Sequence, residues 1–167
     1  MFPYRCAAVA VALAVALAAC SSQGGRGDRP VVDERTEALV SLAAAHHKRA
    51  DLALAQGVRA DAKTEMTTLI GAARKAGLTT AEAWDVRFDA SGRLARLHLE
   101  DEELSEAEAA VVQGLDGADA APATLVHGHL YQIYGDVLEK KGDARGAVAQ
   151  HGKAIEVFKV ILNRGAP

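Results

Sequence analysis

The sequence predicts an all-α protein, and three observations support this fold class. After residue 19 the chain contains 28 alanines, and alanine has the highest intrinsic helix propensity. No proline occurs from Val31 to Ala121, so this long stretch lacks the residue that breaks helices most strongly. Apolar residues recur at intervals of three and four, which is the period of a helix with one buried face.

Capping residues and glycine stops divide the chain into six predicted helices. Ser, Thr, Asp or Asn before a helix satisfies its first N–H groups, and glycine after the last turn accepts a left-handed conformation. The predicted helices begin at Asp33, at Arg59, at the capping boxes Thr79-x-x-Glu82 and Ser105-x-x-Glu108, at Pro122, and at Asp143 or Ala144. They end near Gln56, Ala76, Asp101, Asp116, Gly142 and Asn163, and Gly92 lies inside the third as a candidate kink.

Apolar stripes at helical spacing predict which side of three helices is buried. Because the connections are short, successive helices are expected to pack antiparallel. The stripe of the first helix is Leu39, Leu42, Ala43, Ala50 and Ala53. The stripe of the fifth is Val126, Leu130, Ile133, Tyr134, Val137 and Leu138, and that of the last is Ala147, Val148, Ala154, Ile155, Phe158, Ile161 and Leu162.

The first 20 residues have the features of a targeting signal. Arg5 gives a weakly positive start, and residues 6–19 form an apolar run without a charge. This run is shorter than the roughly 20 residues that a membrane-spanning helix needs, and it matches the apolar region of a secretory signal. The next motif, Leu17-Ala18-Ala19-Cys20, resembles the lipobox of bacterial lipoproteins. The resemblance implies cleavage before Cys20 and lipid on its sulfur and amine; the alternative is a signal peptide cleaved at Ala-x-Ala, with Cys20 incidental.

Three segments are therefore expected: a signal peptide at 1–19, a lipidated cysteine with a glycine-rich flexible tether at 20–32, and a helical domain at 33–165. Ser21 resembles the residue that follows the cysteine in lipoproteins of the outer membrane, so the resemblance implies a periplasm-facing protein of the bacterial envelope. Loss of Arg5 changes the formal charge from −3 to −4, which argues against a nucleic-acid partner. With Cys6 removed and Cys20 lipidated, no thiol remains for a disulfide or a metal.

A stretch near the C-terminus has the pattern of a helical repeat. It reads Tyr131-x-x-Tyr134-Gly135-x-x-Leu138, followed by Gly142, Ala147 and Ala154, and it resembles a tetratricopeptide repeat. That family places a small residue of the first helix against a small residue of the second, so that the backbones approach closely. The pairs Gly135–Ala147, Ala95–Ala107 and Ala50–Ala62 share a spacing of 12 residues. The resemblance implies three antiparallel hairpins stacked as an α-solenoid.

The sequence also departs from this family. The copies are offset by 45 and 40 residues, whereas the family repeats about every 34. His151 stands where the family has an aromatic residue, and Arg49 stands where it has an apolar one. The alternative architecture is a compact six-helix bundle, which would leave no continuous concave groove.

No catalytic motif is present. Neither a Gly-x-Ser-x-Gly elbow nor a His-Glu-x-x-His pair occurs. Neighbouring histidines such as His127 and His129 are two residues apart, so their side chains diverge around a helix rather than converge on a metal. Six acids between Glu100 and Glu108 lack the spacing of a calcium loop and are expected to form a solvated corner. We therefore expect neither enzymatic activity nor a cofactor.

The repeat resemblance implies that the first helices line a concave face and bind a protein or peptide partner in the cell envelope. The residues expected on that face are His47, Asp51, Arg96, His129, Gln132, Asp136 and Glu139. An alternative function is a periplasmic helical bundle that binds a metal or small ligand through inward-facing His46, His98 or His151.

Overall fold

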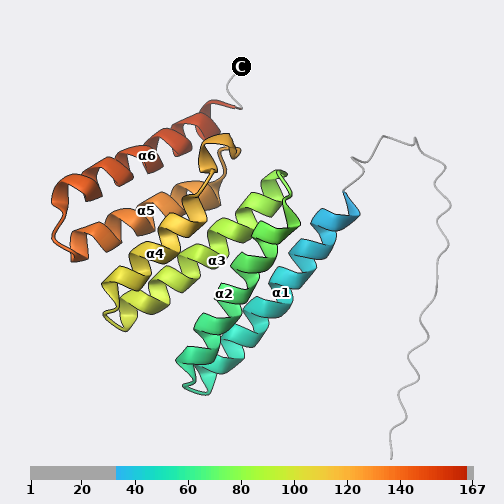
Figure 1. Cartoon of the computed structure of the whole chain (residues 1–167). Helices are drawn as coiled ribbons and strands as arrows, with labels where there is room; N and C mark the ends of the chain where they lie inside the picture. The colour runs from blue at the N-terminus through green and yellow to red at the C-terminus, as the bar shows by residue number, and fades with distance from the viewer. Residues whose placement is uncertain (1–32, 165–167) are drawn as a thin grey trace, which may run out of the picture. The chain divides into compact units, whose positions relative to one another are not determined.

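The computed structural model describes residues 33–164, and this part of the chain contains helices and no strand. The helices are α1 Glu34–Ala55, α2 Arg59–Ala76, α3 Ala81–Glu100, α4 Leu104–Leu115, the short 3-10 helix η1 Ala118–Ala120, α5 Leu125–Lys140 and α6 Ala144–Asn163 (Figure 1). The predicted all-α fold class is confirmed.

Most helix ends lie where capping residues predicted them. The side chains of Asp33 and Asp143 accept hydrogen bonds from backbone N–H groups in the first turns of α1 and α6. Gly77 ends α2 in the left-handed conformation, with φ 62°. Gly92 does not end the helix, because α3 continues through it. A Cβ atom at Gly92 would lie 2.8 Å from the Ile133 side chain, so this glycine permits a close approach of α5.

Three predicted helix starts need correction. The hydroxyl of Thr80, not that of Thr79, caps α3 by accepting from the N–H of Ala83. Helix α4 begins at Leu104, so Ser105 lies inside its first turn. The reason is a tight turn closed by the bond from Glu103 N–H to the His98 carbonyl.

Pro122 lies outside α5, contrary to the prediction. The residue before a proline favours extended backbone, and Ala121 is extended, with ψ 145°. The helix begins three residues after the proline, at Leu125, where the hydroxyl of Thr124 accepts from the N–H of His127.

The helices form three antiparallel hairpins, α1/α2, α3/α4 and α5/α6 (Figure 1). Successive hairpins meet where α2 packs on α3 and α4 packs on α5. The first helices also pack on one another, α1 on α3 and α3 on α5. The core between them contains fully buried large side chains, among them Met66, Leu69, Ile70, Phe88, Val111, Leu130 and Val137.

The predicted stripe of α6 is only partly buried. Ala147 and Ala154 are buried, but Val148, Ile155 and Leu162 are exposed by 73%, 53% and 77%. The stripe is wider than the surface that α5 can cover, and within residues 33–164 α5 is the one helix that packs extensively on α6. Leu42 in the α1 stripe is exposed as well, whereas Leu130, Ile133, Val137 and Leu138 of α5 are buried as predicted.

Two glycines allow α5 and α6 to approach closely. A Cβ atom at Gly128 would lie 2.3 Å from the Phe158 ring, and one at Gly135 would lie 2.4 Å from the His151 ring. Each ring therefore rests on a stretch of bare α5 backbone. All six small residues that the repeat spacing pairs, Ala50, Ala62, Ala95, Ala107, Gly135 and Ala147, are buried.

Candidate functional site

The first-helix face is the surface that α1, α3 and α5 share, and it contains several of the predicted partner-binding residues. A guanidinium nitrogen of Arg93 lies 2.5 Å from Oδ1 of Asp51, which joins α3 to α1. The Nε2 of His47 lies 3.2 Å from Oδ2 of Asp89, outside hydrogen-bond geometry. Burial lowers the pKa of His47, and the negative charge of Asp89 opposes that shift.

Two shallow cavities indent this face. One of about 100 Å³ lies between α3 and α5 and is lined by Arg96 and His129, among others. The other, of about 170 Å³, lies between the first hairpin and α3, and Arg93 and Arg96 line both. Within residues 33–164 Arg96 takes part in no ion pair. This arginine can therefore donate to an acidic group of a partner without breaking an internal pair.

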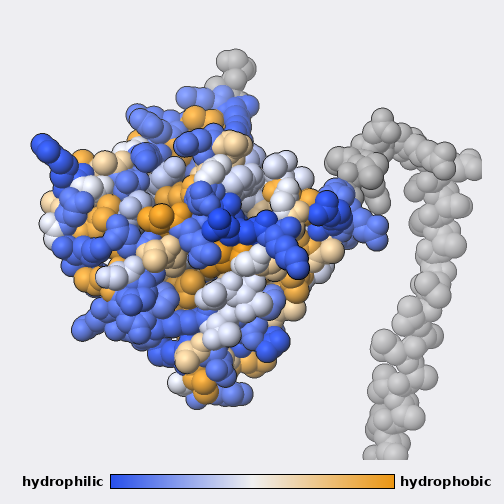
Figure 2. Space-filling model, viewed as in Figure 1, coloured by the Kyte–Doolittle hydropathy of each residue, from blue (hydrophilic) through white to orange (hydrophobic). Residues whose placement is uncertain are grey.

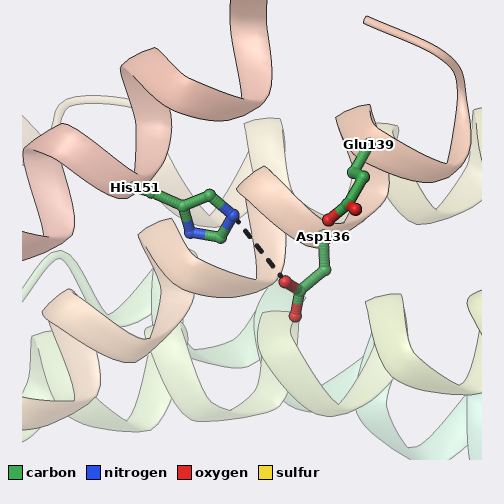
Figure 3. A group of neighbouring side chains, drawn as sticks. All are labelled: Asp136, Glu139 and His151. Atoms are coloured by element: carbon green, nitrogen blue, oxygen red, sulfur yellow. Dashed lines mark ion pairs between the residues drawn. The ribbon is translucent and has the colours of Figure 1, made fainter. Parts of the chain in front are cut away.

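The remaining predicted residues, Gln132, Asp136 and Glu139, are exposed on α5. Asp136 and Glu139 lie beside His151 of α6, and one donor atom from each of the three falls within 4.8 Å of the others (Figure 3). The Nε2 of His151 is 3.9 Å from Oδ1 of Asp136. A zinc ion held at about 2.0–2.2 Å would need these exposed side chains to close up. As it stands, the arrangement is an open acidic cluster with one imidazole.

The three histidines of the alternative ligand-binding function do not converge. His46 Nδ1 lies 2.7 Å from Glu65, and His98 Nδ1 lies 2.5 Å from Glu103. In the described residues only His151 belongs to a group of three potential metal ligands.

The acidic run is solvated at Glu100, Glu102 and Glu106, as expected, but part of it also connects hairpins. Lys63 of α2 binds both Asp101 and Glu103, and Arg59 binds Asp101 at 2.7 Å. The hydrogen bond from Lys63 is the largest cause that lowers the pKa of Asp101 and of Glu103. The prediction missed this network because the basic partners stand about 40 residues earlier in the chain.

A larger cavity lies away from the first-helix face, between α4, α5 and α6. It measures about 700 Å³, and Tyr131 and Tyr134 of α5 line it together with Gln150 and Lys153 of α6. The Nζ of Lys153 lies 5.4 Å from the centre of the Tyr131 ring. The Oε1 of Gln150 is buried and has no hydrogen-bond partner.

A stack of rings supports this cavity. Trp84, Phe88, His127 and Tyr131 follow one another with centroid separations of 5.4, 4.5 and 5.1 Å. Burial lowers the pKa of His127, so its imidazole is neutral near pH 7. Nothing in the helical period shows that α4 and α6 stay apart and leave Tyr131 lining a cavity.

On the viewed face of the helical part, hydrophobic residues form separate patches between hydrophilic ones (Figure 2). No helix among residues 33–164 combines the length and the apolarity that crossing a membrane requires. The signal segment, Cys20 and the tether lie outside the described residues. Comparisons with protein-family models, curated proteins and solved structures find no match to this chain.

Proposed function

We propose that this protein is a lipid-anchored helical-repeat adaptor that binds a protein or peptide partner at the bacterial cell envelope. The observation that carries the proposal is a row of charges across the three first helices. Asp51, Arg96 and Asp136 each follow the small crossing residue of their helix by one position. Because α1, α3 and α5 pack in order, these charges lie in sequence along one surface. Such a row suits charge-assisted hydrogen bonds to a partner of complementary charge.

The packing of the helices supports the solenoid over the compact bundle. The first helices pack on their neighbours, whereas no comparable packing joins α2 to α4 or α4 to α6. A closed bundle would also place the first hairpin against the last, and the described helices lack such packing. The burial of all six small crossing residues agrees with close helix pairs in every hairpin. An open stack of this kind exposes an extended face for a partner.

Capture from envelope extracts tests the adaptor function. The full chain is the bait, and Arg96→Glu and Asp136→Lys reverse two charges of the row. We expect one or more partners to be recovered with the natural chain and to fall at least tenfold with either variant. Lys75→Glu, an exposed change on α2, serves as the control and should leave recovery unchanged. The proposal fails if no partner is captured, or if the two charge reversals behave like the control.

The same cells test the anchor. Growth with labelled palmitate should label the natural chain, and Cys20→Ala should abolish the label. An unlabelled natural chain contradicts the anchor but leaves the adaptor function standing. The metal or small-ligand binder stays a second candidate, which now depends on His151 alone among the three histidines.

A further inference from the structure

The last hairpin has an outer surface, here called the terminal face, on which two stripes run side by side. The stripe of α6 is apolar and exposed, with residues at intervals of seven: Val148, Ile155 and Leu162. The stripe of α5 is polar and exposed: His129, Gln132, Asp136 and Glu139. Two contacts place the stripes together. Asp136 lies 3.9 Å from His151, and the His129 ring centre lies 5.7 Å from that of Phe158.

The repeat register shows what such a face normally contacts. When the small residues Ala62, Ala107 and Ala147 are aligned, Ile155 corresponds to Ile70 and Leu115. Ile70 is fully buried, and Leu115 is partly buried against the core. These two residues lie on α2 and α4, the helices that pack on the following hairpins. Ile155 occupies the same position on α6, yet more than half of it is exposed.

Val148 occupies the position of an inter-hairpin ion pair. Its counterpart Lys63 binds Asp101, the residue that ends α3, and its counterpart Glu108 binds Lys141, the residue that ends α5. In the first and second hairpins this position therefore faces the next hairpin. In the third hairpin the residue at this position is Val148, which carries no charge. The terminal face thus continues the established inter-hairpin interface, in a more apolar form.

The apolar stripe is complementary to itself. If two copies of α6 pack antiparallel about a twofold axis at Ile155, this residue meets its own copy and Val148 meets Leu162 of the second copy. The helices α5 and α6 run antiparallel, with Gly135 level with His151 and Gly128 level with Phe158. In this register Ile155 of α6 lies level with Tyr131 of α5, so the same axis brings the carboxylate of Asp136 to within three residues of the level of His129 in the second copy. At each end one carboxylate therefore lies within about one helical turn of an imidazole of the second copy.

We propose that the terminal face binds a second copy of this chain, through antiparallel α6 helices related by a twofold axis at Ile155. The inference goes beyond the proposed function, since it needs neither the envelope partner nor the lipid. Asp136 and His129 belong to both surfaces, so a partner and a second copy compete for them, and the variants below that change the interface therefore alter residues of α6 alone. The interface consists of two helix stripes of a single hairpin, so we expect a weak dimer with a dissociation constant in the micromolar range.

Cysteine crosslinking of the full chain tests the axis. Ile155→Cys should form a disulfide-linked dimer by itself, because a residue on a twofold axis meets its own copy. Val148→Cys should crosslink in a mixture with Leu162→Cys chains, and neither variant should crosslink alone. Ala149→Cys, exposed on another side of α6, is the control, and the natural chain gives the background from Cys6 and Cys20.

Light scattering of the purified full chain in detergent tests the association itself. Ile155→Asp should raise the dissociation constant at least tenfold, while Leu52→Asp, an equally exposed change on α1, should not. Circular dichroism must show the same helix content in both variants. If Ile155→Asp does not fold, the crosslinking of the cysteine variants tests the proposal instead. A natural chain that stays monomeric at 100 µM overturns the proposal. It is equally overturned if Ile155→Cys crosslinks no more than Ala149→Cys, or only to a different protein.

Discussion

The outer faces of α2 and α6 occupy equivalent positions in the proposed repeat, but only one of them is covered. Ile70 on α2 is fully buried because α3 packs on that helix, whereas Ile155 on α6 is 53% exposed because no described element follows. Their side chains have the same size and the same helical register. The difference shows that burial in a stacked protein depends on the neighbouring hairpin and not on the helix's own pattern.

The strongest test of this comparison is the matched pair Ile70→Ala and Ile155→Ala. The first leaves a cavity in the core and should lower the free energy of unfolding by about 2–5 kcal/mol. The second removes a half-exposed side chain and should cost less than about 1 kcal/mol. Urea denaturation at low protein concentration measures both. Equal losses would mean that Ile155 is buried in the monomer, and the comparison would fail.

A smaller effect of opposite sign is expected from two glycines. A Cβ atom at Gly114 on the covered helix α4 would lie 2.6 Å from the Cβ of Ser91, so Gly114→Ala should destabilise the fold by about 1–2 kcal/mol. Gly152 on α6 has no atom within 4 Å of such a position. Gly152→Ala should therefore stabilise the fold by about 0.5–1 kcal/mol through helix propensity. Thermal unfolding would contradict the comparison if both variants shifted in the same direction.

The smallest expected effect is on how the stability of the fold depends on pH. In the folded chain the pKa values of Asp101 and Glu103 lie below their usual range, with the hydrogen bond from Lys63 as the largest cause. The stability that this depression supplies is present above the unfolded pKa values of about 4 and is lost as the pH falls through the lower, folded values. The melting temperature of Lys63→Met should therefore lie a few degrees below that of the natural chain at pH 7, and the gap should narrow at pH 3. A gap independent of pH would show that Lys63 acts through packing alone, and Lys75→Met is the control.

Helix positions followed from the sequence where the signal was local. Asp33 and Asp143 are bonded to their own first turns, and Gly77 needs only its own backbone freedom, so these ends were predicted correctly. The helix starts predicted from Ser105 and Pro122 were wrong, because contacts outside α4 and α5 determine where these helices begin. The turn closed on His98 begins α4, and Thr124 rather than Pro122 begins α5.

The candidate residues were less predictable than the helices. The repeat spacing suggested a face containing Arg96 and His129, and the structure places both beside one cavity. It could not indicate that Asp51 pairs with Arg93, because the two are 42 residues apart and neither belongs to a local motif. The cavity at Tyr131 was missed for a related reason, since it results from a separation between two helices.

The two internal junctions carry ion pairs of opposite polarity. At the first junction α2 supplies the cation and the end of α3 supplies the anion; at the second, α4 supplies the anion and the end of α5 supplies the cation. If a folding chain stacked its third hairpin directly on its first, Lys63 would meet Lys141, and two like charges would repel. The alternation of charge therefore disfavours stacking the third hairpin on the first, by the modest energy of a partly exposed charge pair.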